Sequence, residues 1–99
     1  MRMMMMVAMD TATTTDSVRD GSVNRVMQST IEALKPEGAY FGPHNGHRTA
    51  FIVFDMDDPS RLPAISEPLF RVLGADIDVF PVMDREDLQR GLSDLGMEN

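Results

Sequence analysis

The first apolar run of the chain, residues 2–9, ends at Asp10. Its length and flanks are typical of a strand covered on both faces. Methionine is a mediocre strand former, so the prediction rests on length rather than on propensity. Six of the ten methionines lie within the first nine residues. Such a cluster serves either as ordinary core filling or as an adaptable pocket wall.

A polar, threonine-rich segment follows, "TATTTDSVRDGS" at residues 11–22. It is predicted to be a loop that enters a helix, with Asp16, Asp20 or Ser22 as the N-cap. Apolar positions then recur at helical spacing, and Pro36 predicts the end of that helix. The apolar stripe consists of Val23, Met27, Thr30, Ile31 and Leu34.

Two apolar stretches, residues 38–43 and 48–56, flank Asn45-Gly46, the dipeptide most indicative of a tight β-hairpin. A two-residue turn places position 44 opposite 47, 42 opposite 49 and 40 opposite 51. Because side chains alternate along a strand, two faces can be separated. One carries Ala39, Phe41, Ala50, Ile52 and Phe54, which suits packing against helices. The other carries Tyr40, Gly42, His44, His47, Thr49, Phe51, Val53 and Asp55.

The second half of the chain predicts another helix with clear boundaries. Asp58 is a suitable N-cap with Pro59 after it, and Gly74 is a suitable C-cap. Pro68 inside the segment is expected to kink or divide the helix. A strand at residues 76–83 and a short helix with an acidic start complete the pattern.

This order, β-α-β-β-α-β plus a C-terminal helix, predicts one ferredoxin-like α+β domain over residues 1–99. It has a four-stranded antiparallel sheet with two helices on one face. Those helices leave the face with Tyr40, Phe51 and Val53 uncovered, and an exposed apolar patch usually marks an interface. We therefore expect a homodimer whose two sheets meet across a two-fold axis and enclose a mostly apolar pocket.

Charge and composition narrow the set of partners. The net charge is −7, and the nine basic residues, eight arginines and Lys35, are scattered singly. Without a basic stripe, neither nucleic acid nor an anionic membrane is an expected partner. The absence of cysteine excludes disulfides and thiolate metal sites. The N-terminal apolar run is far shorter than the ~20 residues of a membrane span, and a cytoplasmic protein is expected.

The stretches "GAYFGPHNGHRTAFIVFDMDDPSRL" and "ADIDVFPVM", together with the order of elements, resemble the dimeric α+β barrel superfamily. The resemblance covers roughly residues 2–83 and is greatest to a group of small uncharacterised bacterial members. Branches similar to muconolactone isomerase and to cofactor-free monooxygenases or polyketide cyclases are more distant. The resemblance implies a dimer with a cleft between sheet and helices. It implies no reaction, because no catalytic signature of any branch is present.

Candidate chemistry centres on the two histidines, which form a cross-strand pair beside the turn. His44 and His47 are either solvated at the hairpin tip, or proton-transfer groups, or two metal ligands lacking a third, such as Asp10 or Asp55. Tyr40 on the same face is the third catalytic candidate. The predicted ligand-binding residues are Tyr40, His44, Thr49 and Phe51 on one wall and Met4 and Met6 on another.

Other motifs add little chemistry. "DMDD" at residues 55–58 resembles a cation-binding cluster, but the pattern of an EF-hand loop is missing, and a strand end followed by an N-cap explains Asp55 and Asp58 better. There is no phosphate-binding loop, nucleophile elbow or catalytic cysteine, and no metal or cofactor is expected. Two functions remain: a cofactor-independent isomerase, cyclase or monooxygenase acting on a small hydrophobic substrate, and a non-catalytic dimeric binding or structural module.

Overall fold

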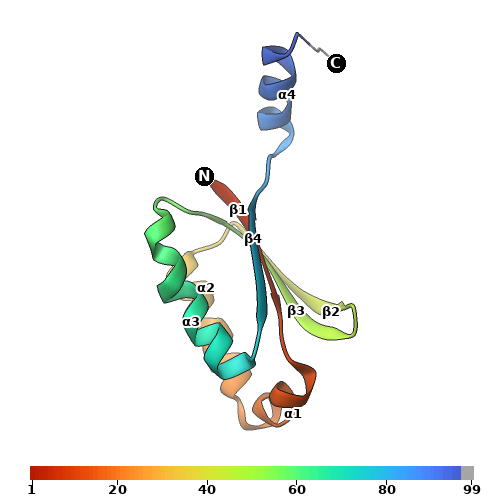
Figure 1. Cartoon of the computed structure of the whole chain (residues 1–99), viewed down its shortest axis with the longest axis vertical. Helices are drawn as coiled ribbons and strands as arrows, with labels where there is room; N and C mark the ends of the chain where they lie inside the picture. Colours follow the sequence, from red (N-terminus) through yellow and green to blue (C-terminus); the bar gives the residue numbers. More distant parts are fainter. Residues whose placement is uncertain (97–99) are drawn as a thin grey trace.

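A computed structural model describes residues 1–96 and shows an α+β fold with one antiparallel sheet in the order β2-β3-β1-β4 (Figure 1). The strands are β1 (Arg2–Ala8), β2 (Gly38–His44), β3 (His47–Asp55) and β4 (Asp76–Pro81). The helices are α1 (Thr11–Asp20), α2 (Ser22–Leu34), α3 (Leu62–Leu73) and α4 (Arg85–Asp94), with a 3-10 turn at Pro59–Arg61. The predicted ferredoxin-like order is confirmed, and α1 is added to it.

The hairpin has the predicted register. His44 lies opposite His47, and Tyr40 opposite Phe51. The turn residues Asn45 and Gly46 both have positive φ, 52° and 78°, as a tight primed turn requires. The two faces inferred from alternation are therefore the two faces of the sheet.

Both long helices, α2 and α3, lie on the same side of the sheet (Figure 1). The core fills the space between these layers. The sheet contributes the fully buried side chains of Met5, Val7, Ala50, Ile52 and Phe54, and the helices contribute Met27, Leu34, Ile65, Leu69 and Leu73. Along β1 buried and half-buried residues alternate. Within one chain β1 is thus covered on one face only, and the single chain does not provide the expected cover of the other face.

The threonine-rich segment is a helix, α1, and not the predicted loop. Its N-cap is Asp10, whose carboxylate accepts hydrogen bonds from the Thr13 backbone N–H at 2.8 Å and hydroxyl at 2.5 Å. The hydroxyls of Thr14 and Thr15 donate to the backbone carbonyls four residues earlier. These local bonds satisfy the polar side chains within the helix, so their polarity does not prevent helix formation.

The Asp10 cap makes a prediction about acid stability. The Thr13 hydroxyl and backbone N–H hold the pKa of the Asp10 carboxyl below its ordinary value. A carboxylate with a lowered pKa stabilises the fold above its unfolded pKa of about 3.9, and this contribution is lost as pH falls through the folded value. Asp10→Ala is therefore expected to lower the melting temperature at pH 7, by a margin that shrinks below about pH 4.

Thermal melts followed by circular dichroism, at pH 7 and below about pH 4, measure the difference in melting temperature between Asp10→Ala and wild type. Asp16→Ala, which removes an exposed carboxylate from the same helix, is the matched control and should melt close to wild type. Equal melting of Asp10→Ala and wild type at pH 7 would show that this cap does not stabilise α1.

The α3 helix continues through Pro68 instead of dividing there. Ile65, Leu69 and Leu73 form one buried face that packs against the sheet. The free energy gained by burying that face on both sides of the proline exceeds the cost of the one backbone hydrogen bond that proline removes. The predicted C-cap is confirmed, because Gly74 ends α3 with φ 55°. Asp58 accepts from the Ser60 N–H at 3.0 Å and so caps the 3-10 turn that precedes α3, whereas the N-cap of α3 itself is Arg61.

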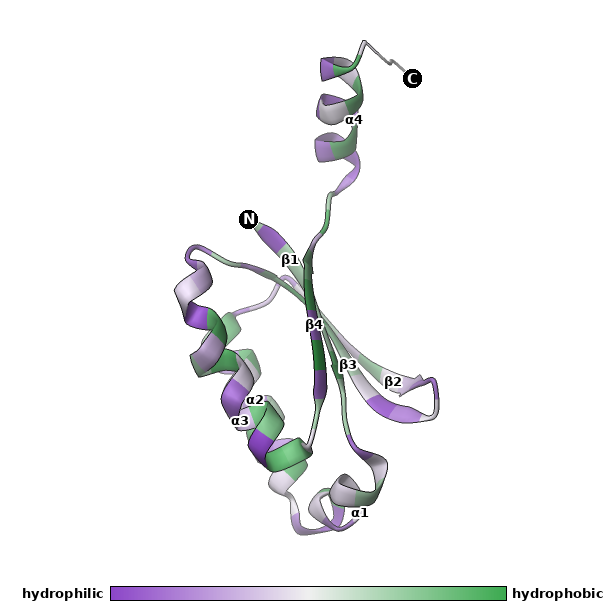
Figure 2. Cartoon of the chain, viewed as in Figure 1, coloured by the Kyte–Doolittle hydropathy of each residue, from purple (hydrophilic) through white to green (hydrophobic). Residues whose placement is uncertain are grey.

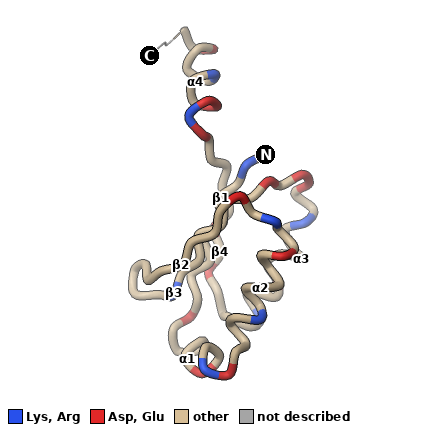
Figure 3. Tube along the Cα trace, turned by 180° about the vertical axis from the view of Figure 1, so that it is seen from behind, with Lys and Arg blue, Asp and Glu red and all other residues tan. Residues whose placement is uncertain are grey.

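The C-terminal helix α4 projects from the body at the far end of β4 (Figure 1). It buries no residue of its own, and the radius of gyration, 15.8 Å, exceeds the value of about 13 Å usual for this length. Arg2 connects α4 to the sheet by ion pairs with Asp84 at 3.3 Å and Asp87 at 3.0 Å. Acidic and basic residues alternate along α4 (Figure 3). Among residues 1–96 no helix is long and apolar enough to cross a membrane.

The sheet face opposite the helices is apolar and uncovered in the single chain. Adjacent strands place Val53, Met4 and Phe80 in one row, and Tyr40, Phe51 and Met6 in the next. Tyr40 is 69% exposed and Phe80 40%, and along β4 hydrophobic residues alternate with hydrophilic ones (Figure 2). The predicted uncovered face is therefore present and extends over all four strands.

Candidate functional site

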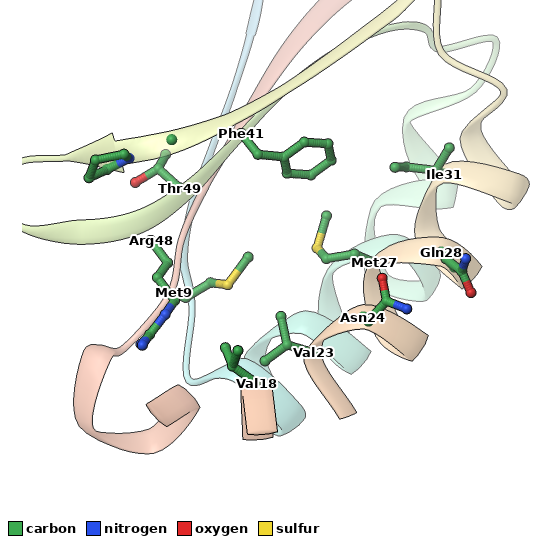
Figure 4. Close-up of a pocket in the computed structure, with 12 residues that line it drawn as sticks. Met9, Val18, Val23, Asn24, Met27, Gln28, Ile31, Phe41, Arg48 and Thr49 are labelled. Atoms are coloured by element: carbon green, nitrogen blue, oxygen red, sulfur yellow. The ribbon is translucent and has the colours of Figure 1, made fainter. Parts of the chain in front are cut away.

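A cleft of about 590 Å³ opens between α1 and α2 on one side and the hairpin strands on the other (Figure 4). The α2 wall consists of Val23, Asn24, Met27, Gln28 and Ile31. The sheet wall consists of residues 41–43 and 48–49, and Met9 and Val18 complete the lining. Small-molecule sites usually measure roughly 300–1,000 Å³ and are mostly apolar, and this cleft meets both criteria.

The cleft exists because the hairpin extends beyond the helical layer. Figure 1 shows the turn end of β2 and β3 diverging from α2. Phe41 is on the helix-facing side of β2, yet 57% of it is exposed because no helix lies directly over it. In Figure 4 its ring points across the gap toward Met27 and Ile31. Phe41 thus forms an apolar wall of an open cleft instead of filling the core.

Polar groups are few in the cleft and occupy two places. Arg48 extends from β3 toward α1, where its Nη1 donates to the Thr14 hydroxyl at 3.0 Å and the Thr11 carbonyl at 3.3 Å. Asn24 and Gln28 lie one turn apart on α2 (Figure 4). A few fixed polar groups on an apolar wall are what orient a small ligand.

Both histidines lie at the exposed hairpin tip, as the solvated interpretation predicts. The His44 ring meets Phe51 edge-on, with centroids 5.6 Å apart. His47 Nδ1 lies 3.5 Å from the Thr11 hydroxyl. Neither imidazole lines the cleft.

Of the other predicted site residues, only Thr49 borders the cleft. By register it belongs to the same face as Phe51, and its hydroxyl donates to the His47 carbonyl at 3.0 Å. Tyr40, Phe51, Met4 and Met6 lie together on the uncovered face. That face brings them together as predicted, but the cleft is on the other side of the sheet. Ligand binding by these four residues and His44 stays a prediction.

The carboxylates considered as metal ligands have structural roles. Asp55 pairs with the amino group of Met1 at 2.7 Å, and Asp10 caps α1. Asp57 pairs with Arg61 at 3.0 Å, and Asp58 caps the 3-10 turn; these bonds hold the pKa of both carboxyls below the ordinary value. In the part of the chain that the structure describes, no three His, Cys, Asp or Glu side chains are grouped to hold a metal.

Three polar residues of the cleft that were not predicted from the sequence could have been recognised from their positions in the sequence pattern. The hairpin register puts Arg48 on the helix-facing side, where a charge is unexpected in a core. Asn24 and Gln28 interrupt the α2 surface beside the apolar stripe. A charged residue on a predicted core face, next to Gly42-Pro43 on the edge strand, indicates that the core stops there.

Comparison with known proteins places the chain in a family but assigns no activity. No curated protein matches the sequence. A family model matches residues 1–96, nearly the whole chain. The chain belongs to the family described as Domain of unknown function (DUF3303).

Proposed function

We propose that the protein binds a small apolar molecule in the cleft between α2 and the β2–β3 hairpin, and that it works as a homodimer. The observation that carries the first part is the composition of the cleft. Six apolar side chains line it, Met9, Val18, Val23, Met27, Ile31 and Phe41. An open apolar surface of this size favours a ligand that removes it from water.

Binding without catalysis is better supported than proton-transfer chemistry. A general acid or base must lie within hydrogen-bond reach of the substrate. Among the described residues, the lining contains no imidazole, carboxylate or phenol, and its only ionisable side chain is that of Arg48. The candidates Tyr40, His44 and His47 lie on the opposite face or at the tip. A cofactor-independent isomerase, cyclase or monooxygenase is the alternative, and it would need its reacting groups on the uncovered face.

The uncovered sheet face supports the homodimer. Its centre is apolar over β1, β2 and β3 and at Phe80 of β4, with Met4 and Phe51 half-buried and Tyr40 and Phe80 exposed. Acidic side chains, Asp76 and Asp78, lie along its β4 edge. A second copy of the same face, related by a two-fold axis, would bury the apolar centre and leave those carboxylates at the rim.

Neighbouring residues on β2 allow the two surfaces to be tested separately. Phe41 points into the cleft, and Tyr40 points to the other face. Phe41→Ala is expected to weaken binding of 2-naphthamide, an uncharged apolar probe, by about tenfold or more, since a buried aromatic contributes about 1.5–3 kcal/mol. Tyr40→Ala should leave probe binding unchanged and weaken the dimer. Probe fluorescence and analytical ultracentrifugation measure the two effects.

The reverse pattern would contradict the proposal. If Tyr40→Ala abolished probe binding and Phe41→Ala did not, the uncovered face would be the ligand site. If wild-type protein bound no apolar probe up to millimolar concentration, the purely structural function would stand.

A further inference from the structure

The charge distribution of the cleft is the starting observation. The chain has 16 acidic residues and nine basic ones, yet none of the 12 residues that line the cleft is acidic and one, Arg48, is basic. The lining of the cleft is therefore free of carboxylates, although the protein as a whole is acidic. A positive end on an otherwise apolar cleft is complementary to an anion with an apolar body.

Arg48 is held in place by uncharged partners. Its Nη1 donates to the Thr14 hydroxyl and the Thr11 carbonyl, and Thr14 is fully buried. Within residues 1–96, no carboxylate lies within ion-pair distance of its guanidinium. A guanidinium offers five N–H donors in a fixed plane. Two contacts through one nitrogen orient the group and leave donors for another acceptor.

The surroundings of Arg48 select the body of the ligand. In Figure 4 the side chain of Met9 lies beside Arg48, Val18 and Val23 follow toward α2, and Phe41 and Met27 face each other farther along the gap. Methionine side chains adapt to irregular shapes, and aromatic rings favour flat partners. The apolar region therefore suits an aromatic or branched aliphatic group, with the charged group at the Arg48 end.

We infer that the cleft binds organic carboxylic acids, with the carboxylate on Arg48 and an apolar, preferably flat, body between Phe41 and Met27. This inference rests on the proposed function, because it specifies the chemical class of the molecule bound in the same cleft. Arginine matches a carboxylate with two parallel hydrogen bonds, which makes such pairs strong and specific. The net charge of −7 opposes anion binding only weakly, since interactions between exposed charges more than about 8 Å apart are largely screened at physiological salt.

A matched pair of probes tests the carboxylate directly. 2-Naphthoate and 2-naphthamide have the same ring system, and only the first is charged at pH 7. Wild-type protein is expected to bind the acid about tenfold more tightly than the amide, because charge-assisted hydrogen bonds are roughly twice as strong as neutral ones. Arg48→Gln should remove this preference for the acid and leave amide binding nearly unchanged. Arg48→Lys, which keeps the positive charge, should retain part of the preference. Arg25→Gln, at an exposed arginine outside the cleft, should keep it.

Each outcome decides the inference. A preference that persists in Arg48→Gln would place the carboxylate elsewhere and overturn it. Equal affinities of wild type for the two probes, both lost in Phe41→Ala, would overturn it while leaving the proposed function in place. Failure of wild type to bind either probe would overturn the proposed function as well. If Arg48→Gln loosens α1 through its lost threonine contacts, the comparison of Arg48→Lys with wild type still measures the preference for the acid.

Discussion

Phe51→Arg is expected to convert the protein from a species of about 22 kDa, twice the 11.0 kDa chain mass, to an 11.0 kDa monomer. Phe51 lies at the centre of the uncovered face, opposite Tyr40 on β2 and Met6 on β1. An arginine there would place an unpaired charge in the proposed interface, and burying such a charge is strongly unfavourable. Sedimentation velocity at low micromolar concentration measures the change.

Glu67→Arg is the matched control, because Glu67 is exposed on α3, away from the uncovered face. It introduces the same side chain and should leave the mass at about 22 kDa. A wild-type protein that sediments as an 11.0 kDa species would contradict the dimer, whatever the variants do.

Phe54→Ala is expected to cost about 3–5 kcal/mol in the free energy of unfolding, the usual cost of removing a buried phenylalanine ring. Phe54 is fully buried on β3, opposite Met3, on the face packed against the helices. The free energy of unfolding of a typical domain is about 5–15 kcal/mol, so much of the stability would be lost. Urea unfolding measures this cost, at one fixed protein concentration because the stability of the proposed dimer would depend on concentration.

Phe70→Ala controls for the chemical change, since Phe70 is 45% exposed on α3. Its expected cost is within about 1 kcal/mol. Equal losses in the two variants would mean that the core does not lie between β3 and the helices.

The fold could be predicted wherever a short segment determined its own geometry. Asn45-Gly46 determined the hairpin turn, and alternation then assigned each residue of β2 and β3 to a face. The α1 helix could not be predicted in this way, because threonine side chains favour loops unless they bond to their own helix, as Thr14 and Thr15 do. Continuity of α3 through Pro68 likewise depends on packing against the sheet.

The candidate site was predicted less well than the fold. Sequence patterns identified the apolar residues of the uncovered face, including Tyr40 and Phe51, and of the predicted ligand-binding set only Thr49 also lines the cleft. The cleft itself depends on how far the hairpin extends past α2, which is a tertiary property. Phe41 has the pattern of a core residue and becomes a cleft wall only because no helix covers it.

The methionine methyls can show directly whether the apolar ligand binds in the cleft, as proposed, or on the uncovered face. Met9 and Met27 line the cleft, whereas Met4 and Met6 lie on the uncovered face. NMR of protein labelled with ¹³C at the methionine methyls, titrated with 2-naphthamide, reports on both surfaces in one experiment. Binding in the cleft predicts saturable shifts of the Met9 and Met27 methyls with Met4 and Met6 unchanged. Shifts confined to Met4 and Met6 would contradict it.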